Sequence, residues 1–319
     1  MPEKPLSGPA GACRSEPPQG RAEAWTVKRL LAWTTQYFAA AGLDTPRLDA
    51  EVLLAHALGL DRLRLYLNYE APVPEDVRGA FRALIQRRRE CEPVAYLTGT
   101  REFFSLRFTV NPSVLIPRPE TEHLVELALR YLRAWQNAPG RPRPRVLEIG
   151  TGCGNIAGAL ARHFPEARVV ATDICRDALA VARENLGALT DASPRVSLVQ
   201  GDLLAWLRQG HARFRLIVSN PPYVSSPAWE SLPRDVRDHE PRTALFGGTQ
   251  GTEIQERMLE TAAPFLEPDG ILLLEMGADQ ADVLRECAQA QGEYRSIRVF
   301  PDFAGRPRVL AAGRSDLPS

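Results

Sequence analysis

The sequence predicts an α/β protein in which a doubly wound, mostly parallel sheet follows a small all-α domain and a linking β-hairpin. Three observations support this fold class. From Arg145 onward, apolar strands alternate with amphipathic helices, which favours parallel strands joined by helical crossovers. Between Trp25 and Glu92, apolar residues recur at helical spacing, with no strand pattern. Residues 101–117 alternate aromatic and polar side chains with a period of two, as hairpin strands do.

The helical domain is expected over residues 25–96. Four or five short helices fit the spacing: one covers Asp49–Leu58, and another starts near Pro74, because proline suits the first turn of a helix. Two roles remain open for this domain. It can stabilise the rest of the chain as a cap, or it can recognise a partner.

The second domain is expected over residues 116–315, after a linking β-hairpin at residues 97–115. Its first helix begins near Pro117 and has an acidic first turn, which the helix dipole favours. Because no helix separates the last two predicted strands, one of them is expected to run antiparallel at the edge of the sheet. The seven predicted strands lie at residues 145–149, 167–173, 195–202, 213–220, 270–276, 294–300 and 306–314.

The bulk composition argues against several classes of protein. The 39 basic and 39 acidic residues balance to a formal net charge of +0, which disfavours a nucleic acid as a stable partner. No apolar run is long enough to span a membrane, so no membrane partner is expected. The five cysteines lack a CxxC pair and fit a reduced cytoplasmic protein. The five histidines show no metal-binding spacing, so no metal site is expected.

Residues 1–24 are expected to form a disordered tail. They are rich in proline and glycine and lack the apolar segment of a signal peptide. A mitochondrial transit peptide is the less favoured alternative, because Arg14 and Arg21 fit it whereas Glu3 and Glu16 oppose it. The expected location is therefore the cytoplasm.

A glycine-rich turn, Gly150-Thr151-Gly152-Cys153-Gly154, follows the first predicted strand of the sheet. Glycines there allow a tight turn and a close approach of the backbone to a ligand. Two interpretations compete: residues 152–157 fit the GxGxxA fingerprint of dinucleotide-binding proteins, whereas GxGxG after Glu148 fits a turn that binds S-adenosylmethionine. Asp173 ends the second strand, where a carboxylate can accept hydrogen bonds from ribose hydroxyls.

Polar residues and glycines gather at one predicted edge of the sheet. The carboxyl ends of parallel strands meet there, and ligands bind at that edge in this fold class. Glu148, Gly150, Asp173, Asp202 and Asn220 all fall at such strand ends. Asp202 ends the third strand, where its carboxylate can accept a hydrogen bond from an adenine amino group. The common position of these five residues indicates a binding site more strongly than any one of the residues does.

The fourth strand ends in Asn220-Pro221-Pro222-Tyr223, a turn suited to methylation of a planar nitrogen. The lone pair of an amide or aromatic amine is delocalised, so a site can activate the nitrogen by accepting both of its N–H bonds. The side-chain oxygen of Asn220 supplies one acceptor and the carbonyl of Pro221 the other. The prolines keep both acceptors rigid, and Tyr223 offers a flat face to the substrate. Asn220, Pro221 and Tyr223 are therefore the expected catalytic residues.

In these motifs, the sequence resembles the HemK/PrmC family of peptide-chain release factor N5-glutamine methyltransferases. The resemblance runs from about Trp25 to the C-terminus and implies a Rossmann-like class I methyltransferase fold with a seven-stranded sheet. It also implies a substrate, the glutamine of the Gly-Gly-Gln motif of class 1 release factors. The matching segments are "IPRPETE" (116–122), "LEIGTGCGNIA" (147–157), Asp173, "SNPPYV" (219–224), "EPRTALFGGTQG" (240–251) and "DFAGRPRVL" (302–310).

The resemblance also implies S-adenosyl-L-methionine as the cofactor and assigns residues to its site. Asp173 would hold the ribose, Asp202 and Leu203 would flank the adenine, and the helical domain would help to dock the release factor. Three residues differ from those usual in the family, and such changes can weaken cofactor stacking while leaving the chemistry intact: Cys153, Asn155 and Leu203. The implied cofactor site comprises Gly150, Thr151, Gly152, Cys153, Gly154, Asp173, Asp202, Leu203 and Asn220, and the implied substrate site comprises Asn220, Pro221, Pro222 and Tyr223.

Three rival functions explain parts of the sequence. An adenine-N6 or cytosine-N4 methyltransferase of nucleic acids would share the Asn-Pro-Pro-Tyr turn, but the balanced charge and "IPRPETE" favour the glutamine family. A nicotinamide-dependent dehydrogenase would explain the GxGxxA match and leave the turn without a role. A non-catalytic binding module would keep the fold, but an intact Asn220 argues against it.

Overall fold

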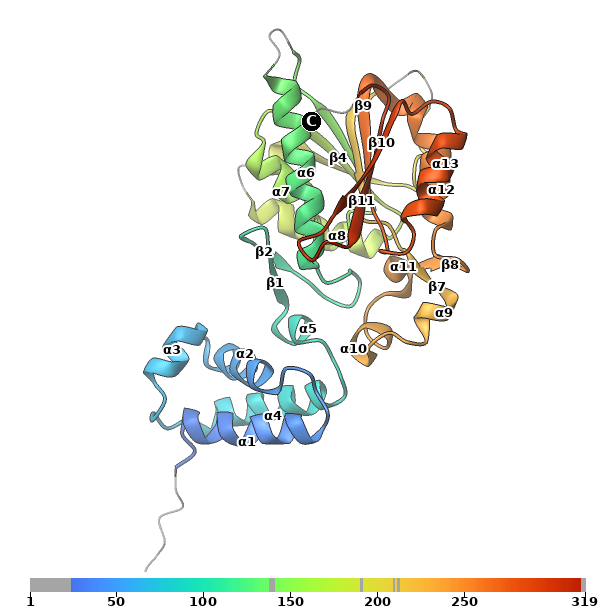
Figure 1. Cartoon of the computed structure of the whole chain (residues 1–319). Coiled ribbons are helices and arrows are strands. Elements are labelled where there is room, and N and C mark those ends of the chain that lie inside the picture. Colours follow the sequence, from blue (N-terminus) through green and yellow to red (C-terminus); the bar gives the residue numbers. More distant parts are fainter. Residues whose placement is uncertain (1–23, 138–140, 190–191, 209, 211–212, 317–319) are drawn as a thin grey trace, which may run out of the picture. The chain divides into compact units, whose positions relative to one another are not determined.

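The structure, a computed structural model, describes residues 24–137, 141–189, 192–208, 210 and 213–316 (Figure 1). The chain divides into two compact units between Arg82 and Ala83. The tail expected over residues 1–24 lies outside the described residues except for Ala24. None of the helices in the described part of the chain is long and apolar enough to cross a membrane.

The smaller unit is helical. It contains α1 (Val27–Ala40), α2 (Pro46–Leu58), α3 (Arg62–Leu67) and the start of α4 (Glu75–Arg89). Side chains cap two of these helices: Thr26 Oγ1 accepts from the Arg29 amide at 3.3 Å, and Asp61 Oδ1 accepts from the Arg64 amide at 2.7 Å. The side chains of Leu31, Phe38, Leu53, Leu54 and Leu65 are fully buried and form the centre of this unit.

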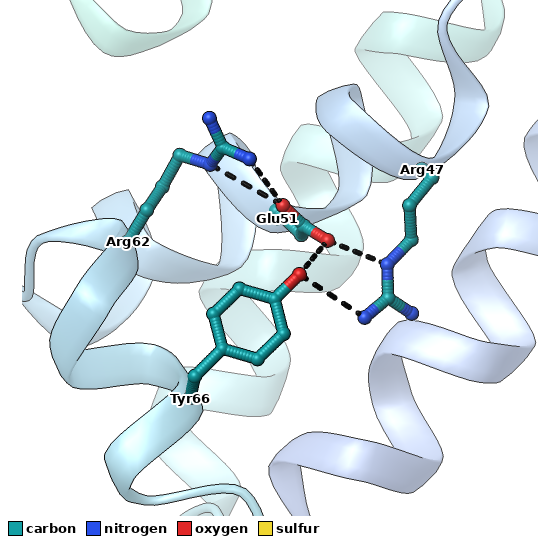
Figure 2. Close-up of polar contacts among 4 residues, drawn as sticks. All are labelled: Arg47, Glu51, Arg62 and Tyr66. Atoms are coloured by element: carbon teal, nitrogen blue, oxygen red, sulfur yellow. Dashed lines mark hydrogen bonds and ion pairs between the residues drawn. The ribbon is translucent and has the colours of Figure 1, made fainter.

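A buried carboxylate joins α2 to α3 in this unit (Figure 2). Glu51 is only 2% exposed. Its carboxylate accepts from Arg47 Nε at 2.5 Å, from Arg62 Nη2 at 2.7 Å and from the Tyr66 hydroxyl. Burial alone would raise the pKa of Glu51, but the hydrogen bonds from Tyr66, Arg62 and Arg47 outweigh it and lower the pKa. The charge is therefore fully paired inside the helical unit.

The larger unit starts with the rest of α4, which a short helix and a hairpin follow. After α5 (Val94–Thr98), β1 (Thr100–Phe103) pairs with β2 (Leu106–Thr109) in antiparallel register. Phe104 and Ser105 form the turn with φ of 51° and 59°, as a two-residue hairpin turn requires. Asn185 fastens the hairpin to the main domain, because its side-chain amide exchanges hydrogen bonds with the backbone N–H and C=O of Thr109 at 2.7 and 2.9 Å.

A seven-stranded sheet forms the centre of this unit, in the order β10-β11-β9-β6-β3-β4-β5. The five strands from β9 to β5 run parallel to one another. The fold class predicted from the sequence, a mostly parallel Rossmann-like sheet after a helical domain and a hairpin, is confirmed. The strands are β3 (Arg145–Ile149), β4 (Arg168–Asp173), β5 (Val196–Gln200), β6 (Phe214–Ser219), β9 (Leu266–Glu275), β10 (Ser296–Pro301) and β11 (Pro307–Gly313).

The antiparallel strand lies one place further inside than the sequence suggested. It is β11, which pairs antiparallel with both β9 and the edge strand β10. The burial of the two strands reflects this order: residues 309–313 of β11 are buried, whereas every residue of β10 is at least partly exposed. The more apolar strand takes the interior position, and the hairpin partner β10 becomes the edge.

Helices cover both faces of the sheet (Figure 1). On one face, α6 (Pro119–Gln136), α7 (Asn155–His163) and α8 (Arg176–Ala188) pack on Val146, Leu216 and other residues of alternate strand positions. On the other face, α12 (Glu253–Ala262) and α13 (Ala281–Ala290) pack on the intervening positions, such as Leu147 and Ile217. This two-sided burial explains why the central strands are continuous apolar runs.

Short elements follow the fourth parallel strand and lie beyond the carboxyl end of the sheet. A parallel pair, β7 (Val224–Ser225) with β8 (Phe246–Gly248), brings the two ends of this segment together. Three helical turns lie between them: α9 (Ser226–Trp229), α10 (Arg234–Arg237) and α11 (Arg242–Leu245). Two 3-10 turns complete the described elements, η1 (Ser193–Arg195) and η2 (Ala263–Phe265).

Candidate active site

The glycine turn after β3 is held in shape by backbone conformation and by its neighbours. Gly150, Gly152 and Gly154 have φ of 75°, 54° and 82°, in a backbone region that residues other than glycine rarely adopt. Gly154 also lies against α8, since a Cβ there would be 3.3 Å from the Cβ of Ala182. The amides of Gly150 and Thr151 both donate to the Thr172 carbonyl at 2.8 Å. The turn is thereby fixed to the neighbouring strand β4.

A buried carboxyl group braces this turn from below. Glu148 is 0% exposed, and its Oε2 accepts from Thr151 Oγ1 at 2.8 Å and from the Ala157 amide at 3.0 Å. Burial raises the pKa of Glu148 to about 8. The side chain therefore joins the turn to the first turn of α7 without lining the cavity above it.

Asp173, at the end of β4, contacts the glycine turn directly. Its Oδ2 accepts from the Gly152 amide at 2.9 Å, and its Oδ1 accepts from the Cys175 amide at 2.9 Å. Each carboxylate oxygen has a second lone pair, so the group can still accept hydrogen bonds from a ligand. Burial raises the pKa of Asp173, although the backbone amides oppose that shift.

Asp202 and Leu203 follow β5 at the same edge of the sheet. Leu203 has φ of 44°, which is uncommon for a residue with a branched side chain. Asp202 is exposed, and its Oδ2 accepts a hydrogen bond from Arg257 Nη2 at 3.5 Å. Both residues line the same cavity as Asp173. Cys153 also lines it, and burial raises the pKa of this thiol to about 12, so it stays protonated.

The Asn-Pro-Pro-Tyr turn leaves β6 toward the same cavity. Asn220 Nδ2 donates to Thr121 Oγ1 at 3.0 Å, which leaves the side-chain Oδ1 as an acceptor. Asn220, Pro221 and Pro222 line the cavity. Tyr223 is not among the lining residues, and its hydroxyl points instead to Glu275 Oε1 at 3.4 Å. The structure therefore gives the cavity three of the four residues of this turn.

Two glycines and a glutamine support the turn from behind. A Cβ on Gly247 would lie 2.6 Å from the Pro222 carbonyl oxygen, and one on Gly251 would lie 2.6 Å from the Tyr223 carbonyl oxygen. Gln280 Nε2 donates to that same Tyr223 carbonyl at 2.9 Å. These contacts explain the repeated glycines of the segment "FGGTQG", since only glycine permits such close packing of two backbones.

One cavity of about 510 Å³ collects these residues, a size suited to a small organic ligand. Every residue of the predicted cofactor site lines it except Gly154, which instead caps α7. The sequence assigned no role to Arg118, Thr121, Arg242 and Phe246, which also line it. The only signal for them was their place in the matching segments "IPRPETE" and "EPRTALFGGTQG".

Those two segments meet in the structure through a buried carboxylate. Glu240 is 5% exposed and accepts from the Ile116 amide at 3.0 Å and from Arg118 Nη2 at 2.5 Å. Because of this contact, Arg118 and the first turn of α6 lie beside Asn220 at the cavity. Arg118 and Glu240 are separated by 122 positions along the chain, so local sequence patterns cannot reveal their contact.

Comparisons with known proteins agree with this architecture. A family model described as the PrmC N-terminal domain matches residues 29–99, and one described as a methyltransferase domain matches residues 146–239. A release factor glutamine methyltransferase of Rhodopirellula baltica is 45% identical over 287 residues, which cover 90% of this chain and 96% of the relative. One of Moorella thermoacetica is 43% identical over 291 residues, covering 91% of this chain and 99% of the relative.

The chain belongs to the release factor glutamine methyltransferase family. The resemblance drawn from the sequence is thus confirmed. Among solved structures, the catalytic domain of hMettl16, in complex with a MAT2A 3'UTR hairpin, matches with a TM-score of 0.55 at 17% identity, covering 71% of this chain and 82% of that chain. That likeness concerns the fold alone. The segment matched by the PrmC N-terminal domain model, residues 29–99, begins in the helical unit and extends past its end at Arg82.

Proposed function

We propose that this protein transfers a methyl group from S-adenosyl-L-methionine to N5 of the glutamine in the Gly-Gly-Gln motif of class 1 peptide chain release factors. One observation carries the proposal: the glycine turn with Asp173 and the Asn220-Pro221 acceptors line a single cavity. A methyl donor and a planar amide can therefore meet there. The relatives from Rhodopirellula baltica and Moorella thermoacetica, named for this activity, support the same substrate.

The cavity fits the cofactor at three points. Positive φ angles at Gly150 and Gly152 keep side chains away, and a Cβ on either would meet no atom within 4 Å, so there is open space beside the turn. Asp173 retains lone pairs for two ribose hydroxyls, and Leu203 provides an apolar surface for the adenine, next to the Asp202 carboxylate. When bound, S-adenosyl-L-methionine supplies a methyl group on a sulfonium, which is a strong electrophile.

The protein's own part in the reaction is alignment. Asn220 Oδ1 and the Pro221 carbonyl accept the two N–H bonds of the substrate amide, which directs the nitrogen lone pair toward the methyl group. The rigid prolines reduce the entropy that is lost when the amide binds. Tyr223 comes next in the turn but does not line the cavity, so we assign it to supporting the substrate side of the site, with its hydroxyl directed to Glu275.

We further propose that the helical domain docks the release factor and that the protein acts in the cytoplasm. The match to the PrmC N-terminal domain supports docking, because this domain accompanies the catalytic domain in the family. The bacterial relatives support the location. The Asn-Pro-Pro-Tyr turn alone specifies only a planar nitrogen, and the relatives named for release factor glutamine methylation favour this function over the alternative, a nucleic-acid amino methyltransferase.

One experiment tests these assignments together. The protein is incubated with methyl-labelled S-adenosyl-L-methionine and, separately, with a purified class 1 release factor, with the same factor carrying Gly-Gly-Ala, and with DNA. We expect label on the Gly-Gly-Gln glutamine alone, located by mass spectrometry. Label on DNA with none on the release factor would establish the alternative function instead.

A further inference from the structure

The side-chain amide of Asn220 is held by a hydroxyl from a distant helix. Thr121 lies in the first turn of α6, 99 residues earlier in the chain, and is 1% exposed. The distance from Asn220 Nδ2 to Thr121 Oγ1 is 3.0 Å. An amide nitrogen can only donate, so Thr121 accepts here, and its own single proton is left for a third group.

A carboxyl group, that of Glu275 at the end of β9, lies beside the Thr121 side chain. Glu275 is 0% exposed, its Oε2 has no hydrogen-bond partner in the part of the chain that the structure describes, and the Thr121 side chain favours its charged form. The Tyr223 hydroxyl lies 3.4 Å from Glu275 Oε1. In its charged form, this buried carboxyl can only accept and still has an unpartnered oxygen, to which the Thr121 proton can turn, away from Asn220.

We propose that Thr121 and Glu275 are positioning residues that fix the Asn220 amide with Oδ1 facing the cavity. This inference rests on the proposed function, in which that oxygen accepts an N–H bond of the substrate. The opposite orientation would require Thr121 to donate to Asn220 Oδ1, which Glu275 prevents by taking the proton. It would also turn the Asn220 NH₂ group against the substrate NH₂ group, donor against donor.

The protonation state of Glu275 controls this arrangement. Tyr223, Thr121 and Arg308 face the carboxyl and favour its charged form, with Glu120 opposing them. Burial is the largest effect and raises the pKa of Glu275 to about 7. Once protonated, Glu275 can donate to Thr121, and the Thr121 proton becomes free to turn toward Asn220 Oδ1. The methylation rate should therefore rise with pH across this range.

Substitutions at Thr121 test the positioning role kinetically. Thr121→Val keeps the shape and removes the hydroxyl, whereas Thr121→Ser retains it. We expect Thr121→Val to lower kcat for release factor methylation about tenfold or more with little change in KM, and Thr121→Ser to restore most of kcat. Tyr294→Phe is the matched control, because it removes a buried hydroxyl that donates to the Leu259 carbonyl at 2.8 Å, away from the cavity. Equal kcat in Thr121→Val and the wild type would overturn the proposal.

A second measurement does not depend on activity. The side-chain ¹⁵N–¹H₂ signals of Asn220, in protein labelled with ¹⁵N-asparagine and assigned with Asn220→Asp, report its hydrogen bond. We expect these signals to shift with pH near 7 in the wild type, and to lose that dependence in Glu275→Gln and Thr121→Val. If the pH dependence of the Asn220 signals is the same in the wild type and in both variants, the positioning role is refuted, even if release factor is methylated. If release factor is not methylated by the wild type, the proposed function fails, and these signals still decide how Asn220 is held.

Discussion

The carboxylate of Asp173 and the backbone amide of Gly152 are joined by a hydrogen bond of 2.9 Å. A side chain at the end of one strand thereby shapes the turn that follows the neighbouring strand. We expect one residue to serve two purposes here, because the same carboxylate both positions the glycine turn and faces the cavity.

For this reason, Asp173→Ala should chiefly weaken cofactor binding. The loss of a charged hydrogen bond to a ribose hydroxyl corresponds to about 1.5–3 kcal/mol in binding free energy. Calorimetry with S-adenosyl-homocysteine measures this change in binding free energy. Asp177→Ala, which removes the same charge from an exposed position in the first turn of α8, is the control. Unchanged affinity in Asp173→Ala would mean that the ribose is held elsewhere.

Substitution of Asn220 should separate catalysis from cofactor binding. Asn220→Ala removes one acceptor of the substrate amide, so we expect turnover to fall roughly a hundredfold or more while cofactor affinity stays nearly normal. Single-turnover methylation of release factor and calorimetry provide the two values. Near-normal turnover would show that Asn220 Oδ1 is not the key acceptor.

The buried cluster around Glu51 should contribute measurably to the stability of the helical unit. Arg47 and Arg62 have side chains 41% and 53% exposed and can turn to water when the charge is removed. We therefore expect Glu51→Gln to cost about 2 kcal/mol, less than the loss of a partner in a fully buried pair. Because the folded-state pKa of Glu51 is lowered, this contribution should be present above the unfolded pKa and vanish as the pH falls through the folded value.

Hydrogen exchange of the α2 amides measures the loss of stability of the helical unit in Glu51→Gln. Glu70→Gln serves as the control, since its ion pair with Lys28 is exposed on both sides and should contribute little to stability. The same protection of α2 in Glu51→Gln and Glu70→Gln would contradict the expectation.

Glu148 should make the protein less stable as the pH rises. Its pKa of about 8 in the folded state lies above its ordinary value of 4.5, so the folded protein holds a proton that the unfolded chain releases. Between those two values, the free energy of unfolding should fall by about 1.4 kcal/mol per pH unit relative to Glu148→Gln. Denaturation of both proteins at pH 5 and pH 7.5 tests this, and a difference that does not change with pH would refute it.

The order of the elements and the positions of the strand ends could be predicted from the sequence, because both follow from local apolar patterns and glycine turns. Asp173 and Asn220 could therefore be placed at one edge of the sheet from the sequence alone. The contact of Thr121 with Asn220 could not, because it joins two elements whose relative register is set by packing over the whole sheet. The inward position of β11 also depends on comparing the burial of two similar strands, which their local patterns do not settle.

The tight support of the Asn-Pro-Pro-Tyr turn by Gly247, Gly251 and Gln280 has a consequence for protein engineering. The turn is not a portable module, because its two carbonyl groups are held by backbone contacts from another segment and by a side chain from α13's N-terminal boundary. Grafting four residues onto a different sheet would transfer the chemistry without its scaffold. A designer who wants this amide-binding geometry in a new host must transplant three segments together, with their spacing intact.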